Sequence, residues 1–142
     1  MAKLHFHYGV MSSSKSAKLI IHAYNFQNTG NTVEVLKPAF DTRFSESTVM
    51  SRIGIETPAM ALPNLDNYTP KPETQIVLVD EVQFFAPSDI DKLVQIADNQ
   101  GKLVMCYGLM VDSNEKIFPA PQRLLEVGAK PHRMESSCQI HG

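Results

Sequence analysis

The chain has 142 residues, 43% of them hydrophobic, and a formal net charge of −2 at pH 7. This length predicts one domain, and no apolar run approaches the ~20 residues that cross a bilayer, so we expect no membrane partner. The near-neutral charge argues against nucleic acid as a partner, because binders usually show a basic face. The first residues also lack the apolar segment of a secretory signal, which predicts a cytoplasmic protein.

The first elements of the chain surround a candidate phosphate-binding loop. Residues 4–8 predict a strand and residues 15–28 a helix. The loop is formed by Gly9, Val10, Met11, Ser12, Ser13, Ser14, Lys15 and Ser16. A turn between strand and helix holds phosphate oxygens on backbone N–H groups, while Lys15 would reach the terminal phosphates and the Ser16 hydroxyl would ligate magnesium. Alternatively, the serines only cap the helix.

The rest of the chain continues to alternate strands and helices. Strands are predicted at 33–37, within 52–62, at 76–79 and at 103–107, helices from Ser88 or Asp89 to Asn99 and at 122–127, and loops at 63–74 and 108–118. Glycines at 30, 101 and 128 follow the helical patterns and predict where those helices end. The alternation predicts an α/β fold with a mostly parallel sheet and flanking helices.

A pair of acidic residues follows the most apolar predicted strand. The run at 76–79 is typical of a strand that is buried on both faces, and Asp80 and Glu81 come directly after it. Ligands of open α/β sheets bind at the carboxyl ends of the strands, where two adjacent carboxylates need compensation. Asp80 would hold magnesium, and Glu81 would be the base beside a transferred phosphoryl group. The alternative is that both acids begin a solvated loop.

Five motifs resemble the cellular and bacterial type of thymidine kinase. They are Tyr8 to Ser16, Leu36 to Arg43, Ser51 to Gly54, Val79 to Phe84, and Tyr107 to Leu109 together with Phe118 and the pair Leu124 and Leu125. The resemblance spans nearly the whole chain in the right order. It implies a fold like that of P-loop nucleoside triphosphate hydrolases, and transfer of the γ-phosphate of ATP to the 5′-hydroxyl of thymidine with Mg²⁺. It also implies a homo-oligomer, either a dimer or a tetramer.

The same resemblance assigns roles to individual residues. It implies that residues 9–16 cradle the phosphates, that Ser16 and Asp80 hold magnesium, and that Glu81 takes the proton of the nucleoside hydroxyl. Arg43 matches an arginine near the transferred phosphoryl group, with Lys15 as the second cation. The positions matched to substrate binding are Met11, Asp41, Arg43, Gln83, Phe84, Leu109 and Phe118. Two alternatives remain from the residues alone: an ion pair that holds Arg43 to Asp41, and simple core packing of the two phenylalanines.

Several positions depart from the family pattern. Ser14 stands where the loop consensus has glycine, and Ser113 where the family usually has an aromatic residue that stacks on the base. The family continues into a zinc ribbon and a substrate-covering lasso, so we expect a kinase domain at 1–131 and a remnant of that second domain at 132–142. Cys138 and His141 would be half of a zinc site, which normally has four ligands. A catalytically impaired nucleotide-binding relative and a truncated product therefore remain as alternatives to an active kinase.

The other histidines give a weaker signal. His5 and His7 are two residues apart on a predicted strand, so their side chains lie on one face. They could form a metal pair, but polar residues on a partly exposed edge strand are the favoured interpretation. His22 and His132 are predicted to lie at the surface.

Overall fold

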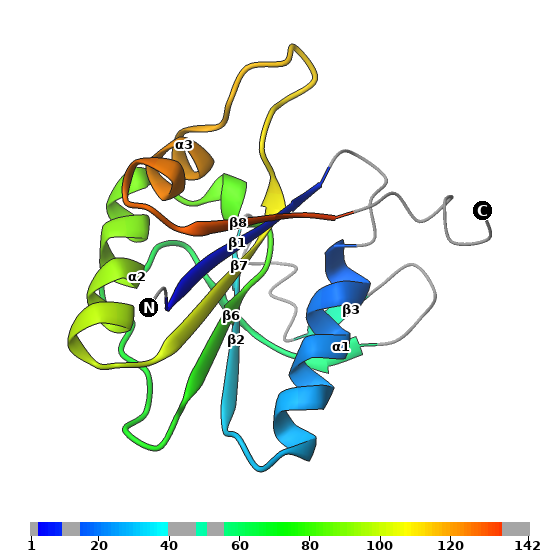
Figure 1. Ribbon diagram of the computed structural model, residues 1–142, viewed down its shortest axis with the longest axis vertical. Coiled ribbons are helices and arrows are strands. Elements are labelled where there is room, and N and C mark those ends of the chain that lie inside the picture. Colours follow the sequence, from blue (N-terminus) through cyan, green and yellow to red (C-terminus); the bar gives the residue numbers. More distant parts are fainter. Residues whose placement is uncertain (1–2, 10–14, 40–47, 51–55, 135–142) are drawn as a thin grey trace.

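The computed structural model describes residues 3–9, 15–39, 48–50 and 56–134, and its centre is a parallel sheet (Figure 1). The sheet has six strands in the order β5-β2-β6-β7-β1-β8, and every pairing within it is parallel. The elements are β1 (Leu4–Gly9), α1 (Lys15–Asn28), β2 (Val33–Pro38), β3 (Thr48–Met50), β4 (Glu56–Pro58), β5 (Met60–Leu62), β6 (Ile76–Val79), η2 (Val82–Phe84), α2 (Pro87–Asn99), β7 (Leu103–Leu109), α3 (Pro119–Glu126) and β8 (Lys130–Arg133). The predicted α/β class is confirmed.

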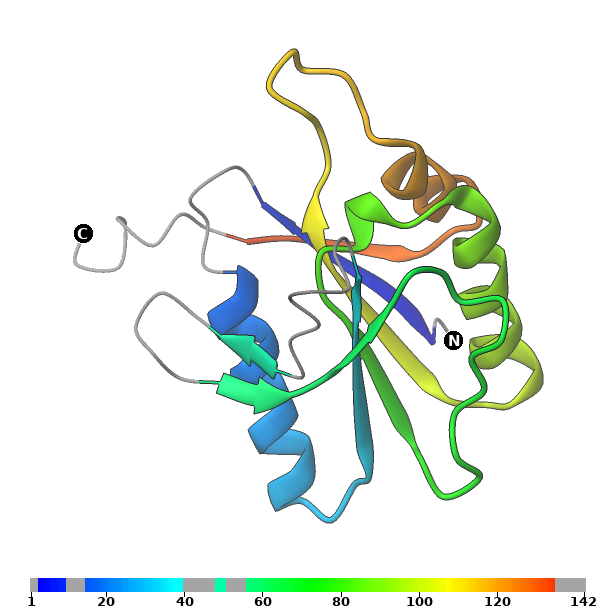
Figure 2. The ribbon, with the colours of Figure 1, turned by 180° about the vertical axis from the view of Figure 1, so that it is seen from behind.

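Helices cover both faces of the sheet. Figures 1 and 2 show α2 and α3 on one face and α1 on the other, where α1 also carries the antiparallel pair β3-β4. Each face has its own apolar core. Strand β6 contributes to both cores, because Val77 and Val79 pack under α2 while Ile76 and Leu78 pack under α1. This two-sided burial explains why the strand is apolar at every position.

Several predicted elements are confirmed closely. The first helix covers residues 15–28 as predicted, the buried strand covers 76–79, and residues 63–74 contain no helix or strand. Gly30, Gly101 and Gly128 have positive φ values, which fits their predicted places after helices.

The starts of the two later helices were predicted too late. Helix α2 begins at Pro87, with Ala86 as its N-cap rather than Ser88 or Asp89. Asp89 still contributes to the helix start, because its carboxylate accepts hydrogen bonds from the backbone N–H groups of Ala86 and Leu65, both at 2.9 Å. Helix α3 begins at Pro119 instead of residue 122, since proline is tolerated in a first helical turn.

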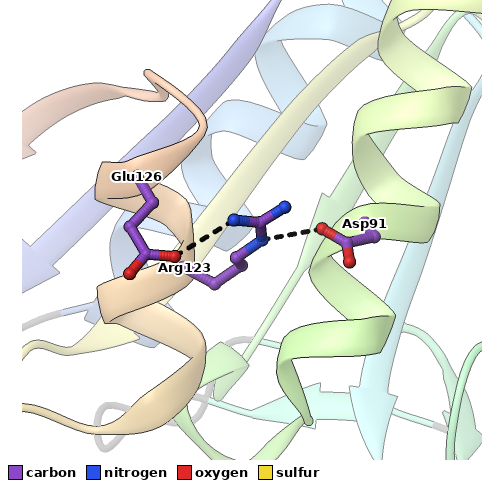
Figure 3. Close-up of polar contacts among 3 residues, drawn as sticks. All are labelled: Asp91, Arg123 and Glu126. Atoms are coloured by element: carbon purple, nitrogen blue, oxygen red, sulfur yellow. Dashed lines mark hydrogen bonds and ion pairs between the residues drawn. The ribbon is translucent and has the colours of Figure 1, made fainter.

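The contact between α2 and α3 combines apolar packing with an exposed ion pair. Arg123 of α3 reaches Asp91 of α2 through its Nε atom at 2.8 Å, and its guanidinium also contacts Glu126 at 3.1 Å (Figure 3). All three side chains are partly exposed, so the apolar residues between the helices hold this contact more than the charges do.

Besides the short strand β3, the sequence prediction missed strand β8. It lies beside β1 at the edge of the sheet, with His5 to Tyr8 paired to Lys130 to Arg133. Its four residues include a proline and two cations, which is an unusual strand sequence but is tolerated at a sheet edge. The predicted domain division after residue 131 falls inside this strand.

Candidate active site

The carboxyl ends of three neighbouring strands form the candidate site. Strand β7 lies between β6 and β1 and runs parallel to both, so the residues that follow β6 and β1 lie at the same edge of the sheet. Gly9, at the start of the predicted phosphate loop, pairs with Leu109 at the end of β7. Asp80 follows β6, and its backbone N–H donates to the carbonyl of Leu36 at 2.8 Å. The topology therefore brings the two predicted motifs to one edge.

The two acids at this edge differ in exposure and in backbone conformation. Asp80 is buried, whereas Glu81 is half-buried and is one of the two non-glycine residues with positive φ in the described part of the chain. Glu81 has φ 52° and ψ 43°, the left-handed region, and this turn leads directly into η2. Such a backbone costs about 1–2 kcal/mol for a residue with a Cβ atom. The acids do not begin a solvated loop, because the residues after them, Val82 and Gln83, are buried.

A buried amide joins Glu81 to the end of β7. The Nε2 atom of Gln83 donates to Oε1 of Glu81 at 3.0 Å, and its Oε1 atom accepts from the backbone N–H of Leu109 at 3.1 Å. Gln83 is only 3% exposed. Both ends of the amide are thus bonded within the protein.

Two of the residues matched to the nucleoside pocket form an aromatic pair above this edge. Phe84 and Phe118 meet edge to face, with ring centroids 6.0 Å apart and an interplanar angle of 71°. Phe84 is 48% exposed, and Phe118 and Leu109 are half-buried. The core-packing alternative is therefore wrong for Phe84, and the pair offers an accessible apolar surface on which a planar base could stack.

The loop after β7 is an ordered turn. Val111 and Ile117 form an isolated β-bridge, and the Oδ1 atom of Asp112 accepts from the backbone N–H groups of Asn114 and Lys116 at 2.8 and 3.0 Å. Ser113, which departs from the family pattern, is exposed in this turn.

Several predicted site residues lie outside the described part of the chain. They are Val10, Met11, Ser12, Ser13, Ser14, Asp41, Arg43, Cys138 and His141, and of Lys15 only the backbone at the start of α1 is described. Ser16 is described and is half-buried in the first turn of α1. Within 3–9, 15–39, 48–50 and 56–134, no group of three or more His, Cys, Asp or Glu residues is arranged to hold a metal ion.

A second polar cluster lies on strands β7, β1 and β8, on the face of the sheet that α1 covers. We call it the histidine column: His5, His7, His22 and His132. His7 is stacked between His132 and Tyr107, with centroid distances of 4.4 and 4.9 Å and interplanar angles of 12°. These three rings sit at one register position on β8, β1 and β7. The edge-strand interpretation is wrong, because β8 lies outside β1.

Hydrogen bonds join His5 to His132 and His22 to Tyr107. His5 Nδ1 and His132 Nε2 are 2.9 Å apart, so one of them donates to the other. The Tyr107 hydroxyl bonds His22 Nδ1 at 2.5 Å. His22 and His132 are half-buried, so the prediction that they are surface residues is wrong.

The environment of the column disfavours protonated imidazole. Burial, together with the neighbouring His132, His22, His5 and Lys18, lowers the pKa of His7 to about 3. Burial also lowers the pKa values of His22 and His132. His5 and His7 each stack on His132, with interplanar angles of 23° and 12°, so the contacts of both rings are with His132 rather than with each other.

Comparisons with known proteins agree with the geometry of the strand ends. A family model described as thymidine kinase matches residues 2–141. The chain is 38% identical over 146 aligned positions to a thymidine kinase of Legionella pneumophila (strain Paris), which covers 97% of this chain and 70% of that relative. It is 37% identical to the thymidine kinase of Enterobacteria phage T4, over 97% of this chain and 75% of the phage protein.

A solved structure supports the fold at a greater distance. The Pif1 helicase from Candida albicans matches with a TM-score of 0.54 and 14% sequence identity, over 92% of this chain. This chain spans 36% of the helicase, and the likeness concerns the fold alone. A family model that matches nearly every residue, and relatives that are similar along nearly the whole chain, show that this chain belongs to the thymidine kinase family.

Proposed function

We propose that the strand-end site transfers the γ-phosphoryl group of ATP to the 5′-hydroxyl of thymidine. The chain is a thymidine kinase-like enzyme by family. The observation that carries the assignment of the site is the pair of acids after β6, one buried and one half-buried, at the edge where the phosphate loop also begins. A phosphoryl-transfer site needs little covalent chemistry from the protein and depends mainly on positioning and charge stabilisation.

The residues present fit a magnesium ion. The Ser16 hydroxyl and the Asp80 carboxylate are oxygen ligands, which Mg²⁺ prefers, and the buried position of Asp80 gives its charge a strong local effect. In this proposal Ser16 and Asp80 hold the ion. Bound there, it would neutralise charge on the phosphate oxygens.

The remaining groups act on the two substrates. The backbone of residues 9–16 and the Lys15 ammonium bind the ATP phosphates, and Arg43 stabilises charge on the transferred group. Glu81 accepts the proton of the 5′-hydroxyl as that oxygen attacks phosphorus. Phe84, Phe118 and Leu109 supply an apolar surface for the base, and this surface is accessible in the structure.

The test is transfer of labelled γ-phosphate from magnesium-ATP to thymidine and to a panel of deoxynucleosides. Glu81→Gln keeps the size of the side chain but cannot take a proton, so we expect kcat to fall by about 10²–10⁴. Glu73→Gln is the matched control, because Glu73 is exposed in the loop before β6, at the opposite end of that strand. No transfer by the folded parent chain would contradict the proposal and leave a nucleotide-binding relative without turnover.

We further propose a cytoplasmic homo-oligomer, in which Cys138 and His141 are half of a zinc site that holds metal only where a second chain completes it. Exposed apolar side chains on α1, Ile21 and Tyr24, support self-association, since each is about half exposed. Light scattering on the eluting protein would give the mass of the assembly, and elemental analysis of the purified chain would give its zinc content. A monomer would contradict the first statement, and zinc retained by a monomeric chain would contradict the second.

A further inference from the structure

The orientation of the Gln83 amide is fixed by the protein around it. A backbone N–H group can only donate, so the bond to Leu109 requires the oxygen of the amide on that side. The NH₂ group then necessarily faces Glu81, whose Oε1 atom accepts at 3.0 Å. The carboxylate of Glu81 is therefore supplied with a donor whose position depends on the backbone of β7.

The turn that carries Glu81 is shaped by its own hydrogen bonds. The carbonyl of Glu81 accepts from the N–H of Phe84 at 3.1 Å, and the carbonyl of Val82 accepts from the N–H of Phe85 at 3.0 Å. The left-handed backbone of Glu81 is unfavourable by itself, and these hydrogen bonds of the turn stabilise it. The turn brings residues 81 and 83 to the same side, so the amide can reach the carboxylate two positions earlier.

Gly108 provides the space that the amide occupies. A Cβ atom added at this position would overlap Oε1 of Gln83, and it would lie 3.1 Å from Cγ1 and 3.2 Å from N of Val82. Gly108 does not have a positive φ value, so the glycine is required here for room rather than for backbone conformation. Strand β7 thus contributes both the space and the N–H that orient Gln83.

We propose that Gln83 is a positioning residue that holds the Glu81 carboxylate for proton abstraction, acting through Glu81 rather than on the nucleoside. The inference rests on the proposed function of this site, in which Glu81 is the base. A donor on one carboxylate oxygen fixes the orientation of the Glu81 side chain, and the bond to Leu109 fixes the donor in turn. A 1 Å misplacement of a catalytic group can lower the rate by ~10²-fold, so losing this hydrogen bond should lower kcat measurably.

The first test is the steady-state kinetics of Gln83→Met, which keeps the volume and removes both hydrogen bonds. We expect kcat to fall by about 10- to 100-fold with KM for thymidine and for ATP within about twofold of the parent. Gln75→Met is the matched control, since the Oε1 atom of Gln75 also accepts from a backbone N–H, that of Thr32 at 2.9 Å, before β6 begins. A raised KM for thymidine with unchanged kcat would overturn the inference in favour of direct nucleoside contact.

The second test asks whether the effect passes through Glu81. In a Glu81→Gln background, Gln83→Met should cause little further loss of single-turnover rate, because residues that act as a unit are not additive. Full additivity of the two losses would overturn the inference even if both variants are folded.

The third test covers the case in which Gln83→Met does not fold. Gln83→Glu keeps the size and the acceptor for Leu109 but places a carboxyl group against Glu81. At neutral pH this carboxylate offers no donor to Glu81, so we expect kcat to fall by about 10-fold or more, with KM for thymidine within about twofold of the parent. An unchanged kcat in Gln83→Glu would overturn the inference alone, whereas a parent chain without transfer activity would overturn the proposed function as well.

Discussion

The strand-end site and the histidine column are both polar clusters on one sheet, but their side chains are held in different ways. At the strand end, ladder pairing is ending, and the N–H of Leu109 is available to orient the amide of Gln83. Along the interior of strands β7, β1 and β8 the ladder uses the backbone groups, and the column residues stack on one another. His5 is bonded to His132, whereas the Nε2 atom of His7 is buried with no hydrogen-bond partner among the described residues. The cluster at the strand ends therefore holds two carboxylates, whereas the column along the strands disfavours protonated imidazole.

The largest expected effect would come from removing the buried charge at the strand end. Asp80→Asn keeps the shape of the side chain but weakens its hold on magnesium, so we expect kcat/KM to fall by about 10²–10³, with a higher magnesium requirement. Rates measured across a magnesium titration would test this. The matched control is Asp98→Asn, an exposed position near the end of α2. Equal magnesium dependence in the parent and Asp80→Asn would show that this carboxylate does not hold the ion.

The column should make the fold sensitive to acid. The pKa of His7 is about 3 in the folded chain and near 6.5 when unfolded. The unfolded chain therefore binds the proton first, and the stability contributed by neutral His7 is complete above pH 6.5 and is lost as the pH falls toward 3. The expected slope is about 1.4 kcal/mol per pH unit for this one proton. Urea unfolding followed by circular dichroism at pH 7.5, 6.5, 5.5 and 4.5 would measure it.

A variant can isolate this contribution from that of the carboxylates. His7→Phe keeps a ring between Tyr107 and His132 but removes the titrating nitrogen atoms, so we expect a shallower loss of stability between pH 6.5 and 4.5. Glu34 also has a lowered pKa, because hydrogen bonds from Thr74, Lys71 and Tyr68 outweigh the opposing effect of burial. Its contribution is lost mainly below pH 4.5, outside that window. Parallel stability curves for the parent and His7→Phe would show that His7 does not control the acid response.

The same comparison explains what the sequence could predict. The acids after β6 were predictable because a fully apolar run followed by two carboxylates marks the end of a buried parallel strand. The link from Gln83 to Gly108 was not predictable, because it depends on how β6 and β7 lie side by side, and the two positions are far apart in the sequence. The sequence does not show whether a glycine such as Gly108 is needed because a side chain would clash or because the backbone must turn.

The histidine column was misjudged for a related reason. The alternation of His5 and His7 correctly placed both on one face, but their burial depends on β8 and α1. Strand β8 has four residues with one proline and no apolar alternation, so local pattern gave no signal for it. Without β8, β1 is an edge strand and its histidines are expected to be solvated.

The smallest expected effect concerns the bond that ties α1 to the column. Burial, followed by the neighbouring Cys106 and Asp80, raises the pKa of Tyr107, so its hydroxyl stays protonated and can donate to His22. Tyr107→Phe keeps the stack on His7 and removes only this hydroxyl, and we expect a loss of about 1 kcal/mol in the free energy of unfolding at pH 7.5. Urea unfolding would measure this loss. Tyr24→Phe is the control, because Tyr24 is on the same helix as His22 but donates from an exposed position to the carbonyl of Glu56.

Equal losses in the two variants would mean that burial adds nothing to the Tyr107 bond. A larger loss in Tyr107→Phe with unchanged kcat would show that the column stabilises the sheet without taking part in phosphoryl transfer.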